Sequence, residues 1–235
     1  MSDEPDDNGN LKNNNVENAN KIAILFGLAS NNSLGELEQI LKADPTKASL
    51  KNEQGIRLLM WAMYHHQTEA AALIYQYLIK PEPSEVVALN DLFKLKQLLE
   101  RNPEWINEFS DDGFTLLHYA CFFGHVECSS FLIEYGAKVN SVAQNPSKVY
   151  PLHSAVATQV IRIVKLLLDF GANVNAKQNG GYTALMSAAM HNNKELIDLL
   201  LSHRADIGIT DDTGKSAYDH GLEKGFDLLQ LKPPT

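Results

Sequence analysis

The chain has little of three things, each of which would point to a definite class of protein. It has 2 cysteines in 235 residues, too few for the disulfide framework of a small secreted scaffold. Its 20 Lys and Arg are outnumbered by 29 Asp and Glu, and this net charge of −9 is opposite in sign to a surface that binds nucleic acids or anionic membranes. Its longest apolar run, residues 22–29, is far shorter than the roughly 20 residues that cross a bilayer. We therefore expect a cytoplasmic protein with neither nucleic acid nor membrane as a partner.

The first 20 residues differ in composition from the rest of the chain. They contain seven Asn, five acidic residues and one Lys, with almost nothing apolar. Such a segment cannot bury enough apolar surface to fold, so the sequence predicts a disordered acidic tail over 1–20 and a folded domain over 21–235. Acidic rather than basic residues before the apolar run also argue against a secretory signal peptide.

A repeat runs through the folded part. The equivalent alanines Ala120, Ala155 and Ala188 are 35 and 33 residues apart, and each is followed by a leucine-rich stretch and a turn. This pattern predicts a short helix, a tight turn, a longer helix and an extended loop in every repeat. The alanines let neighbouring helices approach closely, and the core is expected to include Leu132, Leu167 and Leu200.

These segments resemble the ankyrin repeat, whose unit runs G-x-T-P-L-H-x-A-A-x-x-G-H-x-E-V-V-x-L-L-L-x-x-G-A-x-V-N, and the match is strongest over 110–208. The resemblance implies an all-α solenoid of about seven stacked helix pairs with hairpin loops, the terminal units being degenerate. In the weaker copy over 55–78, Arg57 and Met60 stand where the family prefers Thr and His. Pro81 and Pro83 leave no room for the usual hairpin before the next helix pair.

Four soft metal ligands lie close together in the sequence: His118, Cys121, His125 and Cys128. Their spacing would put all four on one face of a continuous helix, as a zinc site could require. However, Gly124 and His125 form the turn between the two helices of the repeat, and both cysteines take the places of buried residues. We therefore predict no metal site.

No other motif indicates catalysis or a bound cofactor. The segment 208–216 ends in Gly-Lys-Ser like a phosphate-binding loop, but Asp211 and Asp212 within it would repel phosphate. No nucleophile elbow is present. We predict that the chain is not an enzyme and binds no cofactor, while a hydrolase or transferase with an unrecognised site stays an alternative.

The resemblance implies that a partner binds to the hairpin tips and first helices. Several residues at these positions are aromatic or apolar where a solvated surface would be polar, which is typical of an interface. The candidate partner-binding residues are Ile56, Tyr64, His65, Asp111, Asp112, Phe114, Phe122, Phe123, Tyr182, Met190 and His191. Alternatively, Phe122 and Phe123 pack against the neighbouring unit. Asn140 and Asn175 are expected to hydrogen-bond the loop backbone.

The functional hypothesis is a non-catalytic, monomeric module that binds a partner protein as a cytoplasmic scaffold or regulator. An effector that is delivered into another cell and binds a host protein is an alternative with the same fold.

Overall fold

The computed structural model describes residues 7–231, with side chains from residue 19 onward. This part of the chain contains thirteen α-helices and four 3-10 helices, and its only β-type pairings are isolated bridges. The predicted all-α fold is therefore confirmed. The chain divides into two compact units, residues 1–85 and 86–235, where the sequence predicts one repeat domain from residue 21. The boundary follows closely after Pro83, beside the stretch that lacks a hairpin.

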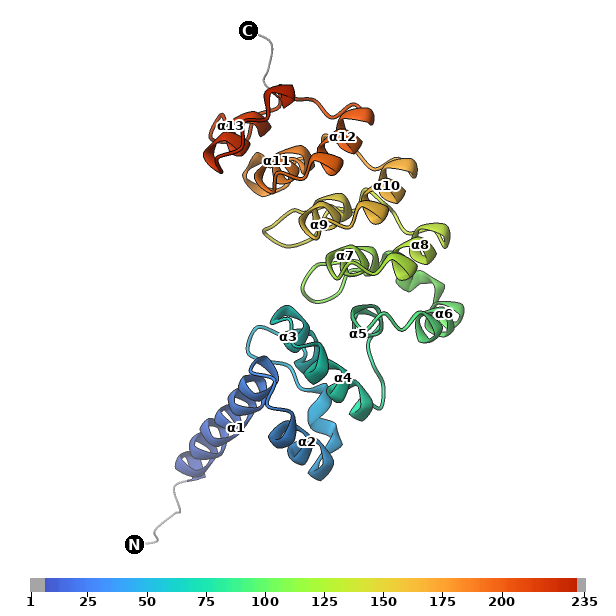
Figure 1. Ribbon diagram of the computed structural model, residues 1–235. Helices are drawn as coiled ribbons and strands as arrows, with labels where there is room; N and C mark the ends of the chain where they lie inside the picture. Colours follow the sequence, from blue (N-terminus) through green and yellow to red (C-terminus); the bar gives the residue numbers. More distant parts are fainter. Residues whose placement is uncertain (1–6, 232–235) are drawn as a thin grey trace, which may run out of the picture. The chain divides into compact units, whose positions relative to one another are not determined.

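The first unit consists of two helix pairs. Its elements are α1 (Asp7–Ser30), α2 (Leu34–Ala43), η1 (Pro45–Ser49), α3 (Leu58–Tyr64) and α4 (Thr68–Tyr77). The first helices α1 and α3 pack against each other, as do the second helices α2 and α4 (Figure 1). Leu37, Leu41, Leu59 and Ile74 are fully buried between them, so the pairs share one apolar core.

Helix α1 begins within the segment that the sequence predicts to be a disordered tail. Residues 7–20 are helical, and residues 1–6 lie outside the described part of the chain. The helix is packed further along, where Leu25, Phe26 and Ala29 are buried. Extending an existing helix costs much less than nucleating one, so a packed helix propagates into residues of poor helix propensity.

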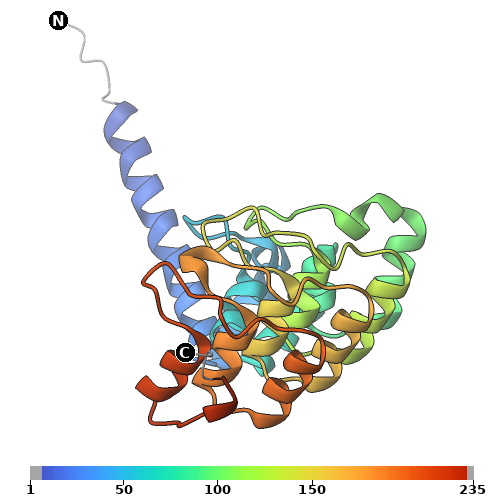
Figure 2. The same ribbon diagram turned by 90° about the horizontal axis from the view of Figure 1, so that it is seen from above.

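The second unit is built of more regular repeats. Its elements are α5 (Pro83–Ala88), which contains the boundary, α6 (Leu92–Arg101), η2 (Pro103–Asn107), α7 (Leu116–Phe122), α8 (Val126–Glu134), α9 (Pro151–Ala157), α10 (Ile161–Asp169), η3 (Asn179–Gly181), α11 (Ala184–Met190), α12 (Lys194–Ser202), α13 (Ala217–Glu223) and η4 (Leu229–Leu231). The first helices α7, α9, α11 and α13 form one row, and the second helices α8, α10 and α12 form another. Seen from above, these pairs lie over one another (Figure 2).

The hairpin loops of the second unit, which we call fingers, are joined by backbone hydrogen bonds. The carbonyl of Gly113 accepts from the N–H of Gln144 at 2.8 Å, and the carbonyl of Gly180 accepts from the N–H of Asp212 at 3.0 Å. Gly113 has φ +82°, and a Cβ atom there would lie 2.8 Å from the backbone of Gln144. Only glycine therefore allows this approach.

Asparagine side chains tie the second-helix ends of successive repeats together. Asn140 accepts from the N–H of Asn173 at 2.8 Å and donates to the carbonyl of Gly171 at 2.9 Å. Asn107 and Asn175 bond the backbone of their following repeats in the same way. The expected loop-bonding role of Asn140 and Asn175 is confirmed.

Candidate functional site

Four aromatic rings lie in contact along the first finger and first helix of this regular array. Phe114 in the finger meets Tyr119 edge to face, with centroids 5.8 Å apart. One helical turn further on, Phe123 lies parallel to Tyr119 at 6.5 Å. Phe122 meets Phe123 edge to face at 5.1 Å. The spacing of four residues between Tyr119 and Phe123 puts both rings on one side of α7. We call Phe114, Tyr119, Phe122 and Phe123 the aromatic cluster.

Exposure separates this cluster from the core of its helix. Leu117, Ala120 and Cys121 on α7 are fully buried. Phe122 is 44% exposed, whereas Phe114 and Phe123 are half-buried. Tyr119 is the buried member of the cluster and supports the other rings. The helix therefore has one side that forms the core and another that carries partly exposed aromatic rings.

A hydrogen-bond network attaches the finger to the aromatic cluster. The Tyr119 hydroxyl donates to Asp112 Oδ1, and the Ser110 hydroxyl lies 2.6 Å from the same oxygen. The carbonyl of Asp112 accepts from the side chain of Asn145 in the next finger at 2.8 Å. Asp111 lies exposed at the tip. The network fixes the orientation of one acidic side chain beside the rings.

The other candidates in the second unit lie further along the array. Tyr182 is half-buried with its ring 5.1 Å from that of His220. Met190 is half-buried at the end of α11, and the exposed His191 donates from Nδ1 to the carbonyl of Ser187 at 2.8 Å. His191 therefore also serves to satisfy the end of its own helix.

Three candidates belong to the first unit and are described within it. Ile56 is half-buried in the hairpin loop before α3, where its N–H donates to Asn52 Oδ1 at 2.9 Å. Tyr64 is half-buried at the end of α3. The exposed His65 donates to the carbonyl of Trp61 at 2.8 Å, which repeats the helix-end role of His191.

The two histidines of the rejected zinc set hold the backbone. His118 accepts from the N–H of Thr115 at 3.2 Å and donates to the carbonyl of Val149 at 3.2 Å. His125 donates to the carbonyl of Ala88 at 2.9 Å. Burial lowers the pKa of His118 to about 4 and also lowers that of His125. Both rings are therefore neutral at pH 7.

The two cysteines of that set are buried thiols. Burial raises the pKa of Cys121 to about 12 and that of Cys128 to about 11, so neither is a thiolate near neutral pH. Among the side chains described, those of residues 19–231, no three His, Cys, Asp or Glu gather as a metal ion would require.

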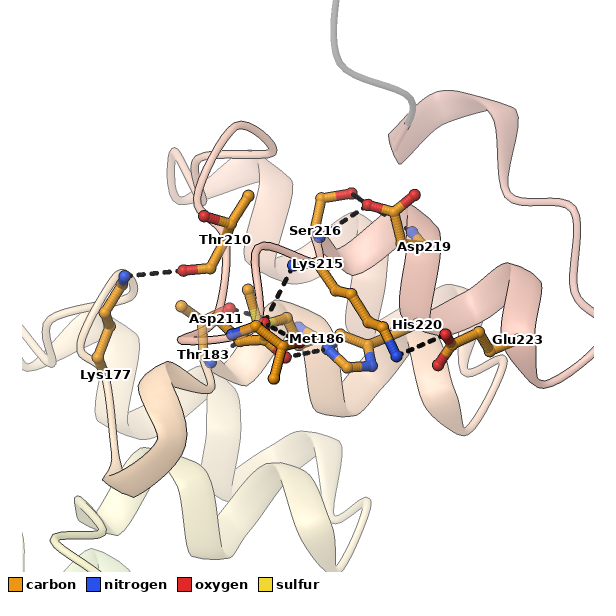
Figure 3. Close-up of polar contacts among 11 residues, drawn as sticks. Lys177, Thr183, Met186, Thr210, Asp211, Lys215, Ser216, Asp219, His220 and Glu223 are labelled. Carbon is orange, nitrogen blue, oxygen red and sulfur yellow. Dashed lines mark hydrogen bonds and ion pairs between the residues drawn. The ribbon is translucent and has the colours of Figure 1, made fainter.

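The Gly-Lys-Ser segment helps to close the C-terminal repeat (Figure 3). Lys215 pairs with Glu223 at 2.6 Å, and Ser216 exchanges hydrogen bonds with Asp219 at the start of α13. Asp211 accepts from His220 at 2.8 Å. Although burial disfavours its ionised form, hydrogen bonds from Thr213, Lys215 and His220 lower the pKa of Asp211 below its ordinary value. These side chains therefore stabilise the end of the array.

The sequence analysis missed two groups, namely Tyr119 of the aromatic cluster and the partner of Arg57. Tyr119 was not a candidate, although its spacing of four residues from Phe123 on a predicted helix could have identified it. The partner of Arg57 was also not predicted. Arg57 Nε donates to the fully buried Glu85 at 2.8 Å, and no motif in the sequence links these two residues.

Within the described residues, no helix combines the length and apolar character needed to cross a membrane. Comparison with known proteins finds relatives that are much longer than the matched region. The chain is 30% identical over 128 residues to the human BCL-6 corepressor-like protein 1, which covers 54% of this chain and 7% of that protein. It is 35% identical over 104 residues to the putative ankyrin repeat protein FPV034 of fowlpox virus, covering 44% and 24%.

The ANK repeat-containing protein nipk-1 of Caenorhabditis elegans is 31% identical over 161 residues, covering 59% of this chain and 26% of that protein. The chain thus spans about a quarter or less of the length of these relatives. A family model described as ankyrin repeats, in three copies, matches residues 25–143 and again 140–211. With most of its length matched by this model and its fold made of stacked helix pairs, the chain belongs to the ankyrin repeat family.

Proposed function

We propose that the chain binds a partner protein through its fingers and first helices, and that the aromatic cluster of the second unit is the centre of this surface. Ankyrin repeats are generally protein-interaction modules. The observation that carries the proposal is the 44% exposure of Phe122, edge to face with Phe123, on a helix whose opposite side is fully buried. Partly exposed aromatic side chains are typical of binding hot spots.

The chain acts as a non-catalytic cytoplasmic monomer in this proposal, and its partner is not a nucleic acid. The residues that resemble catalytic or metal-binding motifs are engaged in hydrogen bonds that hold fingers and helix ends. Both cysteines are buried free thiols, which suits a reducing compartment. The net charge of −9 disfavours nucleic acid.

The proposal is tested by comparing proteins retained from an extract of the producing cells by the full chain and by variants. Phe122→Ala with Phe123→Ala should lose the specifically retained protein, since truncating a hot-spot ring costs about 1 to 3 kcal/mol of binding. Glu134→Ala, which changes an exposed residue on the second helix α8, is the matched control and should retain it.

Binding of the identified protein is then measured with purified components at a temperature where every variant is folded. Equal affinity of the wild type and of the double variant would contradict the proposed surface.

A further inference from the structure

The ends of three first helices form a surface strip in the second unit. Helices α7, α9 and α11 pack side by side, and their last residues are Phe122, Ala157 and Met190 (Figure 1). Each of these helices is followed by a short turn that leads to the second helix of its repeat. We call these helix ends with their turns, residues 122–125, 157–160 and 190–193, the helix-end strip.

Contacts between repeats make the strip continuous. The Thr158 hydroxyl lies 3.2 Å from the carbonyl oxygen of Cys121, which joins the end of α9 to that of α7. The side-chain amide of Asn193 donates to Gln159 Oε1 at 3.0 Å, which joins the turns of the next two repeats. The three helix ends are therefore held together within the second unit.

The strip carries no Asp, Glu, Lys or Arg, although these residues make up 21% of the chain. Burial lowers the pKa of His125, so this ring adds no charge at pH 7. The last residues of the three helices are apolar: Phe122 is 44% exposed, Ala157 is exposed and Met190 is half-buried. Apolar groups that reach the surface at successive repeats are typical of a contact surface.

Several polar side chains of the strip are turned back towards the protein. The Thr158 hydroxyl also lies within 3.3 Å of two carbonyl oxygens of its own helix. His191 places Nδ1 2.8 Å from the carbonyl oxygen of Ser187, and Gln159 Oε1 already accepts from Asn193. The strip therefore offers a partner few polar groups, which favours apolar contact over hydrogen bonding.

The backbone at the helix ends is engaged as well. The N–H groups of Phe123, Thr158 and His191 donate to carbonyls one turn earlier, at 2.9 to 3.3 Å. An extended partner segment needs backbone groups to pair with, and on this strip it would leave its own N–H and C=O groups unsatisfied. A helix bonds its own backbone and can place an apolar face on the strip.

We infer that the partner presents an amphipathic α-helix whose apolar face lies along the helix-end strip, beside Phe122 and Met190 and over Ala157. This inference rests on the proposed function, because it names the kind of partner segment that binds at that surface. Packed helices lie about 8 to 10 Å apart, and seven residues of helix advance about 11 Å, so apolar residues seven apart would meet successive repeats.

A phage-displayed library of helix-forming peptides, with the full chain as bait, tests this chemistry. Peptides of about 18 residues are long enough to span the three repeats. Positions on one face, spaced by three, four and seven residues, are randomised in a framework of Ala, Glu, Lys and Gln. The selected peptides should carry Leu, Ile, Met or Phe at these positions. A synthetic selected peptide should lose at least about tenfold in affinity when a central framework residue is changed to proline, which breaks the helix.

Variants of the chain locate the helix. Ala157→Asp places a carboxylate in the middle of the strip and should weaken the selected peptide by about tenfold or more, because the apolar face would bury this charge. Phe122→Ala should weaken it by about tenfold. Ala43→Asp is the matched control and should leave the affinity unchanged, since Ala43 is also exposed and also the last residue of a helix, α2 in the first unit. All variants are measured at a temperature where they are folded.

The outcomes separate the inference from the proposed function. Selected peptides with charged residues at the randomised positions, or a proline variant that binds as tightly as its parent, would overturn the helix. If such peptides still lose affinity with Phe122→Ala, the proposed surface stands. Affinity that falls with Phe122→Ala but not with Ala157→Asp would overturn the strip and also leave the surface standing.

Two further results would contradict the inference. Apolar helical peptides that bind Ala157→Asp and Phe122→Ala as tightly as wild type would overturn both the strip and the proposed surface. Failure to select any peptide that binds above a scrambled control would overturn the helix, while the retention of a partner from the cell extract decides the proposed function separately.

Discussion

In the second unit, a hydroxyl side chain at the start of a first helix bonds within its own repeat, as Thr115, Thr183 and Ser216 do, whereas the first unit has Arg57 at this position. Arg57 reaches Glu85 at 2.8 Å, and Glu85 also accepts from the N–H of Glu82 at 2.8 Å. The starts of these first helices in the second unit are thus held by hydroxyl groups, whereas the start of α3 in the first unit is held by an ion pair that is largely removed from water.

This difference has an energetic consequence. Burial raises the pKa of Glu85 above its ordinary value despite the neighbouring Arg57, and Nη2 of Arg57 is buried without a hydrogen-bond partner among the described residues. A buried ion pair contributes little net stability but is costly to break on one side only. The first unit therefore depends on one pair, whereas the second distributes the same task over several repeats.

The largest expected effect comes from breaking that pair. Arg57→Met should cost about 3 to 5 kcal/mol, because it leaves the Glu85 carboxylate buried without its cation. Amide hydrogen exchange should show the loss of protection in α3 and α4, with α9 to α12 retaining theirs. Arg57→Met combined with Glu85→Gln should recover much of the stability. Equal loss of protection in both units would contradict the separation between them.

A cavity in the second unit should destabilise that unit and leave the first unit folded. Leu132→Ala should cost about 2 to 5 kcal/mol, since Leu132 is fully buried in α8 and its removal leaves a cavity. Protection should fall in α7 to α10 and persist in α3 and α4. A urea unfolding midpoint equal to that of wild type would show that Leu132 is not core.

We expect the second unit to lose stability as the pH falls. Burial lowers the pKa of His118 and of His153 to about 4, from an ordinary 6.5. Between pH 6.5 and 4 the unfolded chain takes up protons that the folded chain does not, so the free energy of unfolding decreases as the pH falls. The loss is on the order of 3 kcal/mol for each histidine, and it is complete near pH 4.

The first unit should respond in the opposite direction. Because burial raises the pKa of Glu85 above 4.5, the folded chain binds this proton more tightly than the unfolded chain does in the pH range just above 4.5. Its contribution to stability therefore decreases as the pH rises above 4.5. NMR titration of His118, together with urea unfolding between pH 4 and 6.5, checks both predicted trends. His118→Gln should make the free energy of unfolding of the second unit depend less on pH. A titration of His118 near 6.5 would contradict the burial argument.

The smallest effect is expected from the N-terminal end. Deleting residues 1–20 should change the free energy of unfolding by less than about 1 kcal/mol, because this segment has almost no apolar side chains and the packed part of α1 starts later, at Leu25. Thermal unfolding of the full and shortened chains measures it. A large drop in melting temperature would show that the segment stabilises the first unit.

The repeated positions could be predicted from the sequence because each is fixed by local geometry. Ala120, Ala155 and Leu132 are buried as the period indicates, and Asn140 bonds the following loop as expected. The pairing of Arg57 with Glu85 could not be predicted, since it joins residues 28 apart where the repeat pattern is interrupted.

For the candidate surface, the sequence predicted where the residues lie in the repeat but not which contacts they make. The repeat pattern indicates that Phe122 lies at the end of a first helix, but only the structure gives its exposed fraction and the role of Tyr119 in joining Phe123 to Asp112. Helix α1 also starts earlier than composition suggests, because propagation from packed residues overrides local propensity.

The central claim is that the aromatic cluster is a binding surface and not part of the core. It is tested most directly by the free energy of unfolding of Phe122→Ala and Phe123→Ala, measured beside Leu132→Ala under the same conditions. We predict that each phenylalanine variant loses less than about 1 kcal/mol, against about 2 to 5 kcal/mol for the leucine variant. If the phenylalanine variants unfold as readily as Leu132→Ala, the rings are core and the surface is wrongly assigned.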